Sequence, residues 1–145
     1  MLHLSVEGLL AIAAALVVAT ALGLWLRRSG RRLTRPAPRA TGRVLGPGDL
    51  GAPLGERATL VAFSSAFCQP CRATRRVLDQ VCSQVSGVTH VEIDAESHLD
   101  LVRRLDVRRT PTVLVLDADG RVVRRASGQP RVADVVAALG AVVPA

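Results

Sequence analysis

The pattern of hydrophobic and polar positions divides the chain into three parts. Residues 8–26 are apolar or uncharged, residues 29–56 mix Arg, Pro and Gly, and from residue 57 onward short apolar runs alternate with amphipathic stretches. We therefore predict an apolar helix within residues 1–28, a linker over 29–56 and a folded domain over 57–145. A length of 145 residues suits one small domain with an appendage.

Within the third part, β-prone runs predict strands, and apolar residues spaced three and four apart predict helices. The predicted strands are 59–63, 88–93, 112–116 and 121–126, and the predicted helices are 69–85, 97–105 and 130–140. The first two strands, joined by a helix, should be parallel. The last two should form a hairpin over the turn at 117–120. The predicted fold class is α/β: a four-stranded mixed sheet with helices on both faces.

Capping residues predict where some of these elements begin and end. Ser97 is expected to cap the second helix of the domain, with Asp100 completing a near capping box. Pro130 is expected at the first position of the last helix, and Gly140 at its end. In the linker, prolines such as Pro47 argue against a regular helix. Residues 44–45 and 49–54 are nevertheless expected to dock on the edge of the domain.

The apolar segment Gly8–Leu26 is long enough to cross a bilayer. It holds nineteen residues without a charge, and at about 1.5 Å per residue these span about 30 Å. Trp25, at its end, suits a membrane interface. A cleaved signal peptide would be shorter and preceded by positive charge, and a buried core helix is a further alternative. We predict a single-pass membrane anchor.

The net charge of +7 is concentrated next to that segment. Residues 27–43 hold seven Arg and no acid, whereas residues 44–145 hold twelve Arg and eleven acids. This distribution indicates a membrane flank and not a nucleic-acid surface, so no nucleic-acid partner is expected. The positive-inside rule then places the domain on the cytoplasmic side of the cell membrane, with the extracytoplasmic side as the alternative.

A Cys-x-x-Cys pair, Cys68 and Cys71, lies between the first predicted strand and its helix. The free N–H groups and positive dipole at a helix start stabilise a thiolate, the species that attacks disulfides. A structural zinc site needs four ligands. Cys82 falls on the apolar face of the same helix and is expected to be a small buried residue. The three His, His3, His90 and His98, are scattered along the chain. We therefore predict no metal site, and no cofactor is predicted either.

The element order, the Cys pair after the first strand and Thr110-Pro111-Thr112 before the third make residues 58–143 resemble the thioredoxin fold. Within that fold, the chain resembles membrane-anchored, thioredoxin-like (TlpA-like) disulfide reductases of bacteria. The resemblance implies that Cys68 is the nucleophile and Cys71 the resolving residue. It also implies that Pro111 is cis and that Thr110 presents its backbone to a peptide substrate. The remaining substrate-binding residues it implies are Phe67, Gln69 and Pro70.

Three residues depart from the pattern of that family. Phe67 replaces the usual Trp before the first Cys, and Gln69 replaces Gly, so the rim that substrates touch is altered. Ala62 stands where thioredoxins bury an Asp beneath the second Cys. Because that Asp moves a proton to or from the resolving thiol, its absence implies a slower or water-mediated resolving step. His90 falls near a Lys position of the family.

The predicted function is a membrane-tethered thiol–disulfide oxidoreductase that reduces or exchanges disulfides of other proteins. Its partners would be protein disulfide substrates, the membrane and a separate electron donor that the sequence does not identify. The lack of His between the two Cys favours a reductase. Two alternatives are a thioredoxin-like binding or scaffold module with secondary redox activity, and an outward-facing reductase for the cysteines of apo-cytochromes or metal sites.

Overall fold

The computed structural model describes residues 6–29 and 42–143 of the chain. These belong to two separate compact units, residues 1–30 and 31–145, and we describe each by itself. His3 and residues 30–41 of the predicted linker lie outside the described residues.

The first unit contains one helix, α1 (Val6–Ser29). It coincides with the apolar segment of the sequence, and its Leu10, Leu16 and Trp25 side chains are exposed. Within the described stretches of the chain, no helix combines the length and apolarity that crossing a membrane requires. The predicted helix is present, but its prediction as a transmembrane anchor is not supported.

The second unit is built on a four-stranded sheet with the order β2-β1-β3-β4. β1 pairs in parallel with β2 and antiparallel with β3, which pairs antiparallel with β4. The predicted mixed sheet is therefore confirmed, with parallel first strands and a C-terminal hairpin. The bounds are β1 Ala58–Ser64, β2 Val88–Asp94, β3 Thr112–Asp117 and β4 Val122–Ser127.

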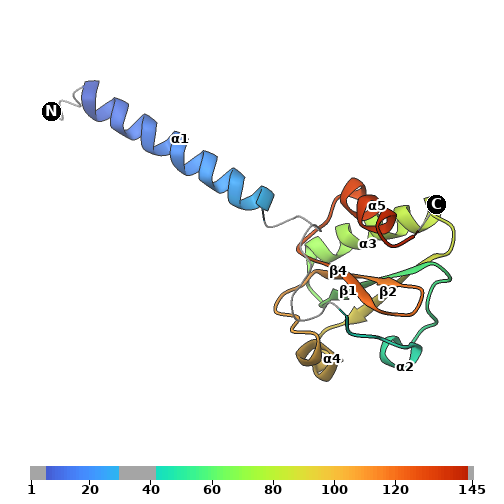
Figure 1. Ribbon diagram of the computed structural model, residues 1–145. Coiled ribbons are helices and arrows are strands. Elements are labelled where there is room, and N and C mark those ends of the chain that lie inside the picture. The colour runs from blue at the N-terminus through green and yellow to red at the C-terminus, as the bar shows by residue number, and fades with distance from the viewer. Residues whose placement is uncertain (1–5, 30–41, 144–145) are drawn as a thin grey trace. The chain divides into compact units, whose positions relative to one another are not determined.

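Helices cover both faces of this sheet, as predicted (Figure 1). On one face lie α3 (Gln69–Gln84) and α5 (Val132–Gly140), and on the other lie α2 (Pro47–Leu50) and α4 (Leu99–Arg104). Alternate residues of β1 enter two different core clusters, because side chains of a strand point to opposite faces. Leu60 and Ala62 face α3 and α5, whereas Val61 and Phe63 belong to the opposite cluster.

Two predicted helix starts are wrong. His98, and not Ser97, occupies the N-cap of α4, because the Ser97 hydroxyl donates to the carboxylate of Asp94 and is not free to cap the helix. α5 begins at Val132, and its N-cap Arg131 is extended at φ −96° and ψ 156°. Pro130 therefore precedes the helix, where its ring is buried, and does not form its first turn.

Residues 42–56, predicted as part of the linker, are packed onto the domain. The N–H of Leu45 donates to the carbonyl of Gly120 at 2.9 Å, and Val44 forms a β-bridge with Arg121. Leu45 and Leu50 are buried in the core. The predicted docking of 44–45 and 49–54 is thus confirmed.

The expectation that proline excludes a helix from this segment is wrong for α2. Pro47 lies in the first turn of α2, where a missing N–H costs no hydrogen bond.

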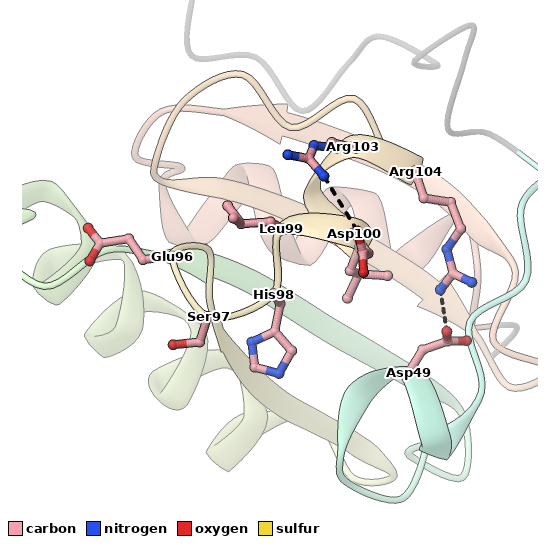
Figure 2. A pocket seen from close by; sticks show the side chains of 9 residues that line it. Asp49, Glu96, Ser97, His98, Leu99, Asp100, Arg103 and Arg104 are labelled. Atoms are coloured by element: carbon pink, nitrogen blue, oxygen red, sulfur yellow. Dashed lines mark hydrogen bonds and ion pairs between the residues drawn. The ribbon is translucent and has the colours of Figure 1, made fainter.

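Asp49 of α2 is paired with Arg104 of α4 (Figure 2). This ion pair, with a hydrogen bond from the Gly46 N–H, holds the pKa of Asp49 below its usual range.

Candidate active site

The Cys-x-x-Cys pair lies at the junction of β1 and α3. Cys68 and Cys71 form a disulfide, with their Cα atoms 5.2 Å apart. Cys71 is buried at 5% exposure, whereas Cys68 is partly exposed. The two sulfurs therefore differ in access: a partner molecule can approach Cys68 but not Cys71.

Cys68 is itself the N-cap of α3. Its backbone is extended at φ −85° and ψ 97°, and its Sγ accepts a hydrogen bond from the Cys71 N–H at 3.2 Å. Pro70 lies in the first turn of this sixteen-residue helix. Cys68 Sγ is thus held against the positive end of the helix dipole, the environment that stabilises a thiolate after reduction.

The loop before β3 is tied to the loop that carries the Cys pair. The peptide bond between Thr110 and Pro111 is cis, as the resemblance implied. The hydroxyl of Thr110 is hydrogen-bonded to that of Ser65 at 3.0 Å, and the carbonyl of Pro111 accepts from the Gly128 N–H at 2.7 Å. Segments far apart in the sequence therefore meet beside the disulfide.

The predicted rim residues, which are neighbours of Cys68 in the sequence, are exposed to solvent. Phe67 is fully exposed at 100%, and Gln69 and Pro70 are exposed as well. An exposed aromatic ring next to the accessible sulfur offers apolar contact area to an incoming chain.

A cavity of about 300 Å³ opens beside both cysteines. Sequence reasoning did not single out Glu92 of β2, the lining residue with the most chemical interest. The signal was available in principle, since Glu92 is aligned with Ala62 across the parallel strands β1 and β2, but the register of two strands cannot be read from either one alone. The lining residues are Ser64, Ser65, Ala66, Cys68, Cys71, Arg72, Arg75, Glu92 and Asp94.

Glu92 forms an ion pair with Arg75 of α3. The Nε of Arg75 lies 2.5 Å from the Oε2 of Glu92. The hydrogen bond from Arg75 lowers the pKa of Glu92, aided by Ser64 and opposed by partial burial. The carboxylate is therefore ionised at neutral pH. Arg75 is thus the counterion of this carboxylate.

Ala62 of β1 and Thr74 of α3 are buried and do not line this cavity. Ala62 is 5% exposed and packs in the core cluster shared with α3 and α5. Thr74, one helical turn after Cys71, is 1% exposed, and its hydroxyl has no hydrogen-bond partner.

Thr74→Val is expected to stabilise the oxidised protein by about 1 kcal/mol, because a buried hydroxyl without a partner costs about 1–3 kcal/mol and Val has the same shape. Urea unfolding followed by circular dichroism measures the change. The matched variant Ser83→Ala removes an exposed hydroxyl that donates to the Gln80 carbonyl, and it should not stabilise. A destabilised Thr74→Val protein would contradict the expectation.

Cys82 and His90 lie outside this arrangement. Cys82 is a free, partly buried thiol whose pKa is raised by burial and by Asp79. It lies eleven residues beyond Cys71, about 16 Å along the helix, too far to exchange with the pair. The Nδ1 of His90 is 2.8 Å from Asp79 Oδ1. Among the described residues, no three His, Cys, Asp or Glu side chains form a metal-binding group.

A second and larger cavity, of about 520 Å³, lies between α2 and α4, with Asp49 and Arg104 at one side (Figure 2). Its charged side chains include the pairs Asp49–Arg104 and Asp100–Arg103. It contains neither cysteine, so its size does not make it the redox site.

A family model described as Thioredoxin matches residues 53–141 of the chain. Thioredoxin of Gallus gallus is 30% identical over 74 residues, which are 51% of this chain and 70% of that protein. Thioredoxin of Mycobacterium tuberculosis is 29% identical over 89 residues, 61% of this chain and 76% of that protein. The matched stretch covers a smaller share, 58%, of Mus musculus thioredoxin.

Solved structures give the same result for the fold. Chloroplastic thioredoxin z superposes with a TM-score of 0.55 at 27% identity, over 60% of this chain and 79% of that one. Fasciola hepatica thioredoxin superposes with a TM-score of 0.53 at 20% identity, over 61% and 83%. At that identity the second likeness concerns the fold alone.

Proposed function

Since this chain belongs to the thioredoxin family and is a thiol–disulfide oxidoreductase, we propose that it reduces disulfides of other proteins with Cys68 as nucleophile and Cys71 as resolving residue. The observation that carries this assignment is the unequal placement of the two sulfurs. Cys68 is partly exposed and caps α3, whereas Cys71 is buried behind it.

In the proposed reaction, the Cys68 thiolate attacks one sulfur of a target disulfide, and the other target sulfur leaves as a thiolate. The Cys71 thiol then loses its proton and attacks Cys68 Sγ. This step forms the Cys68–Cys71 disulfide and breaks the mixed disulfide, so the target leaves fully reduced. The protein is thereby oxidised by two electrons, and a separate thiol donor must reduce its disulfide back to the dithiol.

We assign substrate binding to the surface around Cys68. The exposed Phe67 ring and its neighbours Gln69 and Pro70 supply contact area. Thr110 precedes the cis-proline Pro111 on the loop tied to Ser65, where its backbone would pair with an extended segment of the target. This arrangement favours unfolded or extended protein segments over small disulfides.

Trapping tests the proposal against a binding module with secondary redox activity. In Cys71→Ser the resolving thiol is missing, so covalent adducts between Cys68 and target proteins should accumulate and disappear on treatment with dithiothreitol. The double variant Cys68→Ser/Cys71→Ser is the matched control and should trap none. If Cys71→Ser also traps none while the chain still binds its partners, the binding module is the better description.

We further propose that the apolar N-terminal segment tethers the domain to a membrane, as in the membrane-anchored (TlpA-like) reductases. This proposal rests on the sequence: nineteen residues without a charge over 8–26, then seven Arg within 27–43. By the positive-inside rule the domain would face the cytoplasm. An outward-facing domain, which would suit cysteines of apo-cytochromes or metal sites, is the other outcome of the test.

The full-length chain is expected to stay with membranes after extraction at alkaline pH. A variant with Leu16→Arg and Val17→Arg should move to the soluble fraction, because each Arg at the centre of a span costs about 2.5–3.5 kcal/mol. A matched variant with Leu16→Ala and Val17→Ala should remain. Reporters fused to the C-terminus then identify the side. Recovery of the unchanged chain in the soluble fraction would contradict the tether.

A further inference from the structure

We infer that Glu92 is the proton acceptor for Cys71 in the resolving step, acting through the cavity that the two residues share. The inference rests on the proposed function, because it concerns the second half of that reaction. When Cys71 attacks Cys68 Sγ, its proton would pass by way of water to the Glu92 carboxylate and from there to solvent. The departing target thiolate takes a proton from solvent.

The register of the sheet places Glu92 next to the position where the core lacks an acid. Glu92 and Ala62 are Cα partners across β1 and β2. Ala62 faces α3, in the same core cluster as Val88 of β2, and alternate residues of a strand share one face. Glu92 therefore lies on the α3 face of its strand, beside Ala62.

Arg75 holds the carboxylate in that place. It follows Cys71 by four residues on α3, so the two side chains are neighbours on one helix face. Its Nε lies 2.5 Å from Glu92 Oε2, and Ser64 also hydrogen-bonds the carboxylate. The helix turn that carries Cys71 is thereby joined to the strand that carries Glu92.

The cavity gives the proton a route that the buried thiol otherwise lacks. Cys71 is 5% exposed, and the cavity of about 300 Å³ is lined by both Cys71 and Glu92. The Glu92 side chain is 24% exposed, so it can pass a proton onward to solvent. A polar cavity of this size holds water molecules.

Asp94, the other acid of the cavity, is bonded to the loop that follows β2. It accepts hydrogen bonds from the Ser97 hydroxyl and from the Glu96 N–H. The partners of Glu92 lie elsewhere: Ser64 is on β1, and Arg75 is on α3, the helix that carries Cys71. Glu92 is therefore the acid that is joined to the turn of Cys71.

The charges around Glu92 fix the direction of the pH dependence. Arg75 and Arg72 face the cavity from α3, with Asp94 beside Glu92 on β2, and His90 adds a further favourable charge. The hydrogen bond from Arg75 keeps the pKa of Glu92 below its usual range, so the carboxylate is ionised at neutral pH and stops being available as a proton acceptor only in acid. Removing Arg75 should raise the pKa of Glu92 and move this loss to higher pH.

The two half-reactions can be timed separately with the full-length reduced chain and one equivalent of 5,5′-dithiobis(2-nitrobenzoate). Release of the first nitrothiobenzoate reports attack by Cys68, and release of the second reports resolution by Cys71. Glu92→Gln should slow the second release by about 10- to 100-fold, at or below the lower limit of general-base effects because solvent competes, and should change the first by less than about twofold. Added formate or acetate should restore part of the lost rate.

Two further variants complete the test. Asp94→Asn should leave the second release within about twofold of wild type, and Arg75→Gln should move its acidic limb to higher pH without changing the first release. A Glu92→Gln protein whose second release equals that of wild type, with no effect of formate, overturns the inference. Loss of the first release from the wild-type chain would instead refute the proposed nucleophile, so the two failures are distinguishable.

Discussion

Cys68→Ser is expected to lower the rate of insulin reduction to that of dithiothreitol alone. The reason is steric as well as chemical. Cys71, the other sulfur of the pair, is 5% exposed, so it cannot replace Cys68 as the atom that meets a folded or extended target. The hydroxyl of Ser is not ionised at neutral pH and does not exchange with disulfides. The assay uses the full-length chain in a mild detergent with dithiothreitol as donor.

The matched control for this prediction is Cys82→Ser, which also removes one thiol from α3. Cys82 lies about 16 Å along the helix from Cys71 and is partly buried against the core. Its replacement should leave the rate within about twofold of wild type. If Cys68→Ser retained most of the activity, or if Cys82→Ser abolished it, the assignment of the nucleophile would be wrong.

The second large effect is expected at Leu45, outside the family match. Leu45→Ala should lower the free energy of unfolding of the domain by about 2–5 kcal/mol, because it leaves a cavity among well-packed side chains. Leu45 is 1% exposed, and its N–H donates to the Gly120 carbonyl. Urea unfolding should be followed by circular dichroism, since the single Trp of the chain, Trp25, lies in α1.

Val44→Ala provides the control, one residue away and on the same backbone bridge to Arg121. Val44 is 55% exposed, so its truncation should change stability by no more than about 0.5 kcal/mol. Equal and small effects of the two variants would mean that residues 42–56 do not contribute to the core. Activity should persist in both, because neither residue lines the cavity beside the disulfide.

The sequence predicted the strands of the domain well because their signals are local. Each strand is a short apolar run, and the turn Asp117–Gly120 carries Gly where the backbone adopts φ +77°. The Cys pair and the loop with Thr110 and Pro111 were also found, since both are recognised from adjacent residues.

What the sequence did not reveal depends on contacts between distant segments. That Glu92 lies next to Ala62 becomes known only when β2 is aligned with β1. Ser97 failed as a cap because Asp94, three residues earlier, competes for its hydroxyl. The docking of residues 44–45 was predicted, but the partner of Leu45 was not. Only the fold shows that Gly120 leaves room for it: a Cβ at position 120 would lie 2.2 Å from the Leu45 carbonyl oxygen.

The strand order β2-β1-β3-β4 affects which amino-acid substitutions such a domain can accept during evolution. Ala62 lies in an inner strand, with a partner strand on each side, whereas Glu92 lies in an edge strand. A charge at position 62 would be enclosed and would lower the stability of the fold. The same charge at position 92 keeps contact with water and costs less. The sheet thus lets stability and acid–base chemistry vary independently, so substitutions that retune one need not compromise the other.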